Sequence, residues 1–302
     1  MITRITCVAV AFFFLLPAFG QTDTTRAVNA DSLALLDSTR IDTIAKVPVN
    51  TAPKVPVYKL KPAVDIPIVA VGAGWSLYAF TQIYSKTPST QEEILELDVN
   101  NINSFDRRAV RPFSESIDKA SYYPFFAVMP MPFVFLTGKK TKKDFFKLTF
   151  LYLEAMSITG MLYTASTYFT DRYRPYAYSS ESTMDQRTRG GAKNSFYAGH
   201  VALVATATFF GAKVHADYNP DSKIKWLLYT LAGATTATVA VMRYEAGQHF
   251  PSDLIIGAVQ GTLTGFLVPH FHKHKIIKDP NLSLMPYTNG RDHMLSLVYR
   301  LK

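Results

Sequence analysis

The sequence predicts an all-α integral-membrane helical bundle with five or six apolar helices. Composition is the first observation behind this prediction, because hydrophobic residues make up 48% of the chain and charged residues only 18%, against roughly 25% charged in soluble domains. Pattern is the second, because the apolar residues gather in six runs separated by polar loops. Most runs hold 16–18 residues, near the lower limit of about 17–25 for a spanning helix. An unusually apolar soluble helical protein is therefore the alternative.

The six runs differ in strength. The first is interrupted by one proline and two glycines, and we expect it to dock on the bundle without spanning the membrane. In the last run Gly257, Gly261 and Gly265 recur every four residues, which places a small surface on one helix face where another helix can approach closely. The runs cover residues 66–83, 121–137, 145–170, 197–212, 226–242 and 254–269.

The N-terminus, residues 1–20, is typical of a secretory signal peptide. Arg4 supplies the positive charge, residues 7–16 the apolar core, and residues 18–20 a small-x-small cleavage site, with an uncleaved anchor as the alternative. The single cysteine of the chain lies in this core, so a cleaved chain would have no disulfide or thiol chemistry. Residues 21–63 are polar and then rich in Pro and Val, as expected of an extended periplasmic linker.

The charged loops predict an orientation. The Lys-rich segments 138–144, 221–225 and 270–278 fall on one side of an alternating bundle, and that side is expected to be cytoplasmic. Loops 171–196 and 243–253 then face the periplasm, and the protein lies in a bacterial inner membrane. A cleaved signal peptide would place residue 21 outside the cytoplasm. Six spans that end at the cytoplasmic segment 270–278 would instead require residue 21 inside. This conflict is why we expect the first run not to span.

The membrane-embedded domain is predicted over residues 64–271, followed by a basic tail over residues 272–302. Alternation in "MLSLVYRL" near the end of the tail predicts a short strand. The three histidines of "HFHKH" (270–274) are interpreted as a basic flank at a membrane exit rather than as a metal site. Glu154 lies inside an apolar run and is either a proton carrier or a packed, protonated or helix-paired side chain.

The charge of the chain indicates an anionic partner. The net charge is +9, which suits phospholipid head groups or phosphate esters, whereas no basic helix, zinc pattern or aromatic RNA-binding motif points to nucleic acid. The outward loops gather cations that would repel one another unless an anion lay among them, and arginine pairs bidentately with phosphate. The candidate site residues are Arg172, Arg174, Lys193, His200, Arg243, His249 and Asp253.

Two helix starts supply the predicted chemistry. His200 and Gly199 begin one apolar helix, where exposed backbone N–H groups bind an oxyanion. His249 precedes the next, and Asp253 follows four residues later. A carboxylate that holds one imidazole nitrogen leaves the other free to attack phosphorus. His200 would then protonate the departing alkoxide.

Three stretches resemble the signatures of the type 2 phosphatidic acid phosphatase superfamily, in order and over roughly residues 145–270. "TDRYRP" resembles the end of Lys-x6-Arg-Pro, "SFYAGH" resembles Pro-Ser-Gly-His, and "RYEAGQHFPSD" matches Arg-x5-His-x3-Asp. The resemblance implies a membrane lipid phosphatase that uses no metal or other cofactor. The implied roles are nucleophile for His249, its orientation for Asp253, general acid for His200, and phosphate binding for Arg174, Arg243 and the Gly199 amide.

The chain also departs from these signatures. Thr167 occupies the position of the lysine in the first signature, and Ala198 that of the serine in the second. Met242 occupies the position of the serine that usually precedes the arginine of the third signature. Two phosphate ligands are thus missing, each worth about 1.5–3 kcal/mol as a charged hydrogen bond. Arg172 or Lys193 is expected to compensate for the lysine, so the sequence favours weakened or retuned phosphate binding over loss of activity.

The sequence therefore predicts a phosphatase that acts on a phosphomonoester or pyrophosphate of a membrane lipid through a phosphohistidine. Polyprenyl pyrophosphate, phosphatidic acid, phosphatidylglycerol phosphate and the phosphates of lipid A all fit this prediction. Two alternatives stay open. One is a catalytically degenerate relative that binds anionic lipid, and the other is a vanadate-dependent enzyme like the related haloperoxidases.

Overall fold

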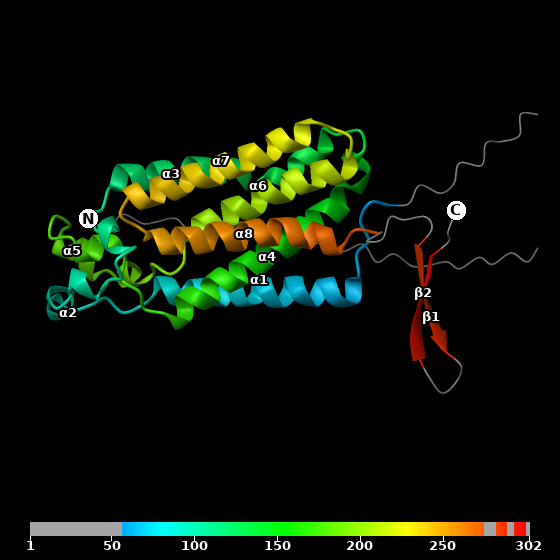
Figure 1. The fold of residues 1–302 in the computed structure, drawn as a ribbon. Helices are drawn as coiled ribbons and strands as arrows, with labels where there is room; N and C mark the ends of the chain where they lie inside the picture. The colour runs from blue at the N-terminus through cyan, green and yellow to red at the C-terminus, as the bar shows by residue number, and fades with distance from the viewer. Residues whose placement is uncertain (1–55, 275–281, 289–292, 300–302) are drawn as a thin grey trace, which may run out of the picture. The chain divides into compact units, whose positions relative to one another are not determined.

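The computed structural model describes residues 56–274, 282–288 and 293–299, and six helices of this part of the chain form a bundle (Figure 1). Successive helices run in opposite directions, because each is joined to the next by a loop at one end of the bundle. The six helices are α1 Pro62–Tyr84, α3 Glu115–Val128, α4 Phe145–Phe169, α6 Gly199–Tyr218, α7 Ile224–Glu245 and α8 Pro251–Phe271.

Short elements cover the end of the bundle at which α8 begins, and they hold the two loops predicted to face outward (Figure 1). The opposite end carries the Lys-rich segments. Lys140 Nζ donates to the carbonyl of Tyr218 at the end of α6, over 3.1 Å, and Lys273 Nζ lies 2.6 Å from Asp217. The short elements at the end where α8 begins are α2 Gln91–Leu95, η1 Val99–Asn101, η2 Arg107–Ala109, η5 Pro175–Tyr178, α5 Met184–Thr188 and η6 Gly190–Lys193, whereas η3 Met131–Leu136 and η4 Thr141–Asp144 lie at the opposite end.

Four helices in the described residues are long and apolar enough to cross a membrane, slightly fewer than the five or six predicted. They are α1, the segment 141–169 that contains α4, α7 and α8. The predicted run 121–137 is divided between α3 and η3, because Pro130 and Pro132 lack the N–H that a continuous helix needs. Helix α6 is the central helix, and most of its side chains are buried.

Helix α1 is long and apolar enough to span, although we expected the first run to dock without spanning. It is continuous over 23 residues, passes Pro67 and meets the length and hydropathy of a span. Gly72 is a position of close packing against α4 rather than a break in the helix. A Cβ atom added at Gly72 would lie 3.0 Å from the carbonyl oxygen of Ser157 on α4. In return, a Cβ at Gly160 of α4 would lie 2.8 Å from Ser76 Oγ on α1.

The predicted glycine face of the last run is confirmed. Cβ atoms added at Gly257, Gly261 and Gly265 would lie 2.6, 2.1 and 2.6 Å from backbone carbonyl oxygens of α6. Real Cβ atoms do not approach a carbonyl so closely, so only glycine permits this separation of the two backbones. This packing brings the start of α8 beside the start of α6, where both histidines of the predicted site lie.

The predicted limits of the membrane-embedded domain, residues 64–271, stay a prediction. Residues 56–61, predicted to be linker, pack against the segment after α8: the amide of Lys59 donates to the carbonyl of His272 over 2.8 Å. Tyr58 is fully buried, and its hydroxyl donates to Asp217 over 2.8 Å. The predicted signal peptide and the rest of the linker lie outside the described residues. In the tail, the predicted strand is β2 His293–Tyr299, which pairs antiparallel with β1 Leu282–Thr288.

Candidate active site

His249 lies directly before α8, and its side chain is only 2% exposed. Its Nδ1 lies 2.7 Å from the carbonyl oxygen of Ser195. A carbonyl oxygen only accepts a hydrogen bond, so Nδ1 carries the proton of the neutral ring. Nε2 therefore has a free lone pair, which is the state of an imidazole nucleophile.

Asp253 does not hold His249 as predicted, because its carboxylate binds other groups. Oδ2 accepts from the hydroxyl of Ser195 over 2.7 Å and from the amide of Phe250 over 3.1 Å. The reason is that His249 precedes the helix and Phe250 is extended, so the four-residue helical spacing does not apply between His249 and Asp253. Asp253 acts on His249 at one remove, by fixing the segment around Ser195 whose carbonyl binds the ring.

Arg172 corrects a second prediction, namely that it binds phosphate in place of the missing lysine. Its guanidinium donates to Asp253 Oδ1, to Asp106 Oδ2 over 2.8 Å and to Ser252 Oγ over 3.0 Å. Asp106 and Asp253 are both fully buried. Two buried carboxylates need a cation between them, and Arg172 is that cation.

Asp106 fastens the start of α8, a role that the sequence did not indicate. Its oxygens accept from the amide of Ser252 over 3.0 Å and from the hydroxyl of Ser252 over 2.6 Å. Burial raises the pKa of the Asp106 carboxyl, but the hydrogen bonds from Ser252, Asn103 and Arg172 outweigh burial and lower that pKa overall. The carboxylate therefore stays ionised beside Arg172.

Arg243, near the end of α7, is 2% exposed and is held from α3. It donates to the carboxylate of Asp118 and, over 3.1 Å, to the hydroxyl of Ser121. Gln248 donates to the same Asp118 oxygen over 2.9 Å. Within the described residues, the Nε of Arg243 has no hydrogen-bond acceptor although it is buried. This N–H is the kind of group that a bound oxyanion would satisfy.

Arg174 and Lys193 are cations without a carboxylate. Arg174 donates only to backbone carbonyls, to Gly191 over 3.0 Å and to Gln248 over 3.5 Å. Among residues 56–274, no Asp or Glu lies within ion-pair distance of either side chain. Both cations therefore remain available to an anion.

The start of α6 contributes His200 and the backbone of Gly199. The His200 ring packs against Tyr122 and Phe125 of α3, with centroids 4.7 and 5.0 Å away. A Cβ atom at Gly199 would lie 2.6 Å from the ring of Tyr163, so glycine is required for this packing. The first-turn amides of α6 have no acceptor inside the helix, and their dipole favours an anion.

The electrostatics of the site act on His249. Burial lowers its pKa well below the ordinary value, and the charges of Arg174 and Arg243, together with His200, lower it further. The carbonyl of Ser195 opposes this lowering but does not reverse it. The ring is thus kept neutral, and both arginines exert their charge at its position.

Thr167, which replaces the family lysine, is fully buried. Its hydroxyl donates to the carbonyls of Tyr163 and Phe196, both over 3.1 Å. The nearby Lys86 binds the carbonyls of Thr167 and Thr170 at the end of α4, over 2.8 and 2.9 Å. Both side chains bind backbone carbonyls, so neither replaces the phosphate contact expected of the lysine in the first signature.

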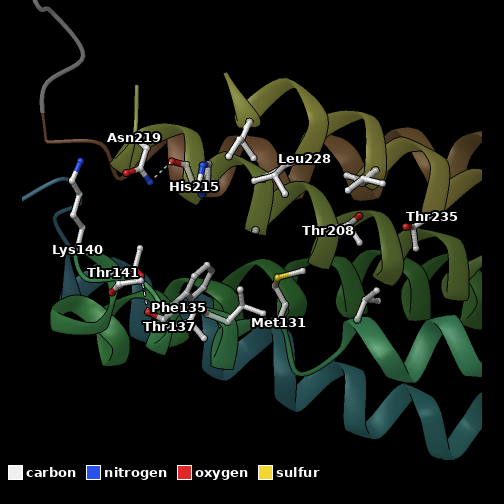
Figure 2. A pocket seen from close by; sticks show the side chains of 18 of the residues that line it. Met131, Phe135, Thr137, Lys140, Thr141, Thr208, His215, Asn219, Leu228 and Thr235 are labelled. Atoms are coloured by element: carbon white, nitrogen blue, oxygen red, sulfur yellow. Dashed lines mark hydrogen bonds between the residues drawn. The ribbon is translucent and has the colours of Figure 1, made fainter. Parts of the chain in front are cut away.

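A cavity of about 720 Å³ lies at the other end of α6 (Figure 2). Its walls are mostly apolar side chains of η3, α6 and α7, with Lys140, His215 and Asn219 at one side. His215 lies fifteen residues after His200, or about 22 Å along a helix. None of the predicted site residues lines this cavity. The candidate active site therefore follows from the charges and hydrogen bonds around His249, at the opposite end.

Two of three comparisons with known proteins found a match. Residues 148–277 match the family model of the PAP2 superfamily. A solved structure of a transmembrane PAP2-type phosphatidylglycerolphosphate phosphatase from Bacillus subtilis is similar at 18% identity, over 71% of this chain and 98% of that one, with a TM-score of 0.43. No curated protein sequence matches the chain. The matched segment holds most of α4 and all of α6, α7 and α8, with both site histidines, and this part of the chain is similar to the PAP2 superfamily.

Proposed function

We propose that the protein is a lipid phosphatase that hydrolyses a phosphomonoester or pyrophosphate of a membrane lipid through a phosphohistidine on His249. The state of His249 carries this proposal. The ring is buried, its proton is held on Nδ1 by Ser195, and its free Nε2 lies within the field of Arg174 and Arg243. A neutral nucleophile beside fixed guanidinium charges is what attack on an anionic phosphoryl group requires.

The reaction proceeds in two steps. His249 Nε2 attacks phosphorus, the bond from phosphorus to the lipid oxygen breaks with its electron pair on that oxygen, and His200 donates the proton that this oxygen takes up. Water then attacks the phosphohistidine, and His200 accepts a proton from it. The phosphorus–nitrogen bond breaks, phosphate leaves, and His249 regains its lone pair.

The phosphate oxygens are bound by groups that have no anionic partner among the described residues. These are Arg174, Lys193, the Nε of Arg243 and the amides that begin at Gly199. Arg172 and Asp253 are positioning residues, since they hold each other and the segment that orients His249. Among these groups, Lys193 is the cation that we expect to compensate for the charge of the missing lysine, since Arg172 is bound to Asp106 and Asp253.

A test of this function is phosphate release by the full chain in detergent. The panel holds phosphatidic acid, phosphatidylglycerol phosphate, a polyprenyl pyrophosphate and a lipid A phosphate. We expect release from at least one of them and its loss in His249→Ala. The matched control is His270→Gln, a histidine at the far end of α8, which should retain wild-type turnover. Equal turnover in His249→Ala would contradict the mechanism, and an inactive wild type would favour the degenerate relative.

We also propose that the site faces the periplasm of a bacterial inner membrane, because the Lys-rich end is expected in the cytoplasm. Residues 56–61 lie at the Lys-rich end of the bundle. If α1 spans, this orientation therefore places residues 56–61 in the cytoplasm, which conflicts with export of the N-terminal segment by a signal peptide over residues 1–20. Single cysteines at Lys139 and Asp185, in a Cys7→Ser chain, report the two ends. A membrane-impermeant maleimide should label Asp185→Cys alone in spheroplasts. Labelling of Lys139→Cys alone would reverse the orientation and support export.

A further inference from the structure

Three buried side chains from separate helices meet at the end of the bundle opposite His249. They are Asp65 in the first turn of α1, Glu154 of α4, and His272 directly after α8, exposed by only 2%, 3% and 9%. One ligand atom from each lies within 4.8 Å of the other two. His272 follows His249 by 23 residues, or about 35 Å along a helix, so this cluster is separate from the proposed active site.

The two ring nitrogens of His272 have different surroundings. Nδ1 lies 2.8 Å from the carbonyl oxygen of Val268, which only accepts, so Nδ1 carries a proton. Nε2 faces the cluster, 3.2 Å from Asp65 Oδ1 and 3.5 Å from Glu154 Oε2. Nε2 and the two carboxylate oxygens are the atoms that can bind a metal ion together.

Glu154 supplies a second, independent observation. Its Oε2 is buried and has no hydrogen-bond donor among the described residues. An unsatisfied buried carboxylate oxygen is costly, because it has lost water and gained nothing. Asp65 differs in that its other oxygen accepts from the amide of Lys61. The free atom of each residue is therefore the one that points into the cluster.

The spacing fits a metal ion better than a hydrogen bond. Nitrogen and oxygen ligands lie about 2.0–2.2 Å from Zn²⁺, which puts two ligands of a tetrahedral site about 3.3–3.5 Å apart. The observed separations from Nε2 are 3.2 and 3.5 Å, longer than the usual charged hydrogen bond of about 2.7–2.9 Å. Outer contacts are present as well, since Val268 fixes the imidazole and Lys61 fixes one carboxylate.

Charge balance supports a divalent cation. Two ionised carboxylates carry a charge of −2, which a divalent ion bound between them cancels. The lysines at this end do not fill the role, because Lys273 and Lys213 both pair with Asp217. One imidazole with two carboxylates suits Zn²⁺, Mn²⁺ or Fe²⁺, while Ca²⁺ takes six to eight oxygens.

We propose that Asp65, Glu154 and His272 bind one divalent transition-metal ion, with Zn²⁺ as the first candidate, and that this ion fastens α1, α4 and the end of α8 together. The site is structural rather than catalytic. It revises the interpretation of "HFHKH" for one histidine only, because His270 and His274 are not part of the cluster.

The test measures metal directly on the full chain purified in detergent from medium supplemented with Zn²⁺. Elemental analysis should find about one equivalent of Zn²⁺ per chain in the wild type. After chelation, titration with Co²⁺ should give the visible d–d bands of a low-symmetry site with nitrogen and oxygen ligands. Thermal unfolding should occur at a lower temperature without metal and return to the higher one when Zn²⁺ is added. None of these wild-type measurements depends on a variant that folds.

Variants then assign the ligands. His272→Gln, Asp65→Asn and Glu154→Gln should each weaken metal binding at least tenfold, whereas the neighbouring histidine variants His270→Gln and His274→Gln should bind as the wild type does. Turnover of the folded His272→Gln protein should stay within about twofold, since the active site lies at the other end of α8. A wild type that neither retains nor rebinds metal would overturn the proposal. Metal that remains on His272→Gln and leaves His270→Gln would overturn it equally.

Discussion

The two ends of the bundle bury charge in opposite ways. At the active-site end, the carboxylates Asp106, Asp118 and Asp253 each bind an arginine or a hydroxyl, and the cations Arg174 and Lys193 have no carboxylate partner among the described residues. At the Lys-rich end, Lys213 and Lys273 pair with Asp217, and the carboxylates of Asp65 and Glu154 face one imidazole. This difference supports the two proposals, an anion as the ligand at one end and a cation at the other.

After the loss of turnover expected for His249→Ala, the largest effect at the anion end comes from the general acid. His200→Ala should lower kcat for a lipid phosphate by about 100- to 10,000-fold, the usual scale of general acid–base catalysis. The leaving group of p-nitrophenyl phosphate has a low pKa and needs no proton. With this substrate, the rate of the first step should fall much less in the variant. A loss that does not depend on the leaving group would show that His200 has a different role.

The two arginines of "DRYRP" should separate stability from binding. Arg172→Ala leaves two buried carboxylates without their cation, and breaking a buried pair costs about 3–5 kcal/mol. We expect a clear drop of the unfolding temperature for this variant. Arg174→Ala should unfold close to the wild-type temperature and instead raise KM or lower kcat. Unfolding and steady-state kinetics of the two variants, measured side by side, check this contrast. The reverse pattern would exchange the roles of the two arginines.

The pH dependence should show a smaller effect. The lowered pKa of His249 means that the ring stays neutral below its ordinary pKa of about 6.5, so kcat/KM should persist as the pH falls through that value. Arg174 is one cause of the lowering, so Arg174→Ala should move the acid limb of the profile to higher pH. Lys193→Ala is the matched control and should leave the limb in place. An acid limb that is identical in all three proteins would contradict this electrostatic account.

Much of the active site was predictable because its residues lie on short motifs at helix starts. The segments with His200, His249, Arg174 and Arg243 were predicted to share one end, and the structure places them there. The contacts between them were less predictable. Asp253 binds Ser195 rather than His249, and this choice depends on the extended conformation of Phe250 before the helix.

The partners that the sequence did not indicate come from distant segments without a motif. Asp106 and Asp118 lie in the mixed-charge stretch 85–119, where any of several acidic residues has the same local pattern. Only the fold brings them to Arg172 and Arg243. The same reason explains His272, which looks like its neighbours in sequence but is the one that α1 and α4 enclose.

The covalent phosphohistidine is the central claim, and trapping it tests the account most directly. The His200→Ala protein is mixed with p-nitrophenyl phosphate and quenched in alkali within a turnover, because the first step needs no acid while hydrolysis has lost its base. Mass spectrometry should then find an alkali-stable, acid-labile phosphoryl group on the peptide that contains His249, and none in the His200→Ala, His249→Asn double variant. Release of p-nitrophenol without a phosphorylated His249, or phosphate on another residue, would contradict the mechanism.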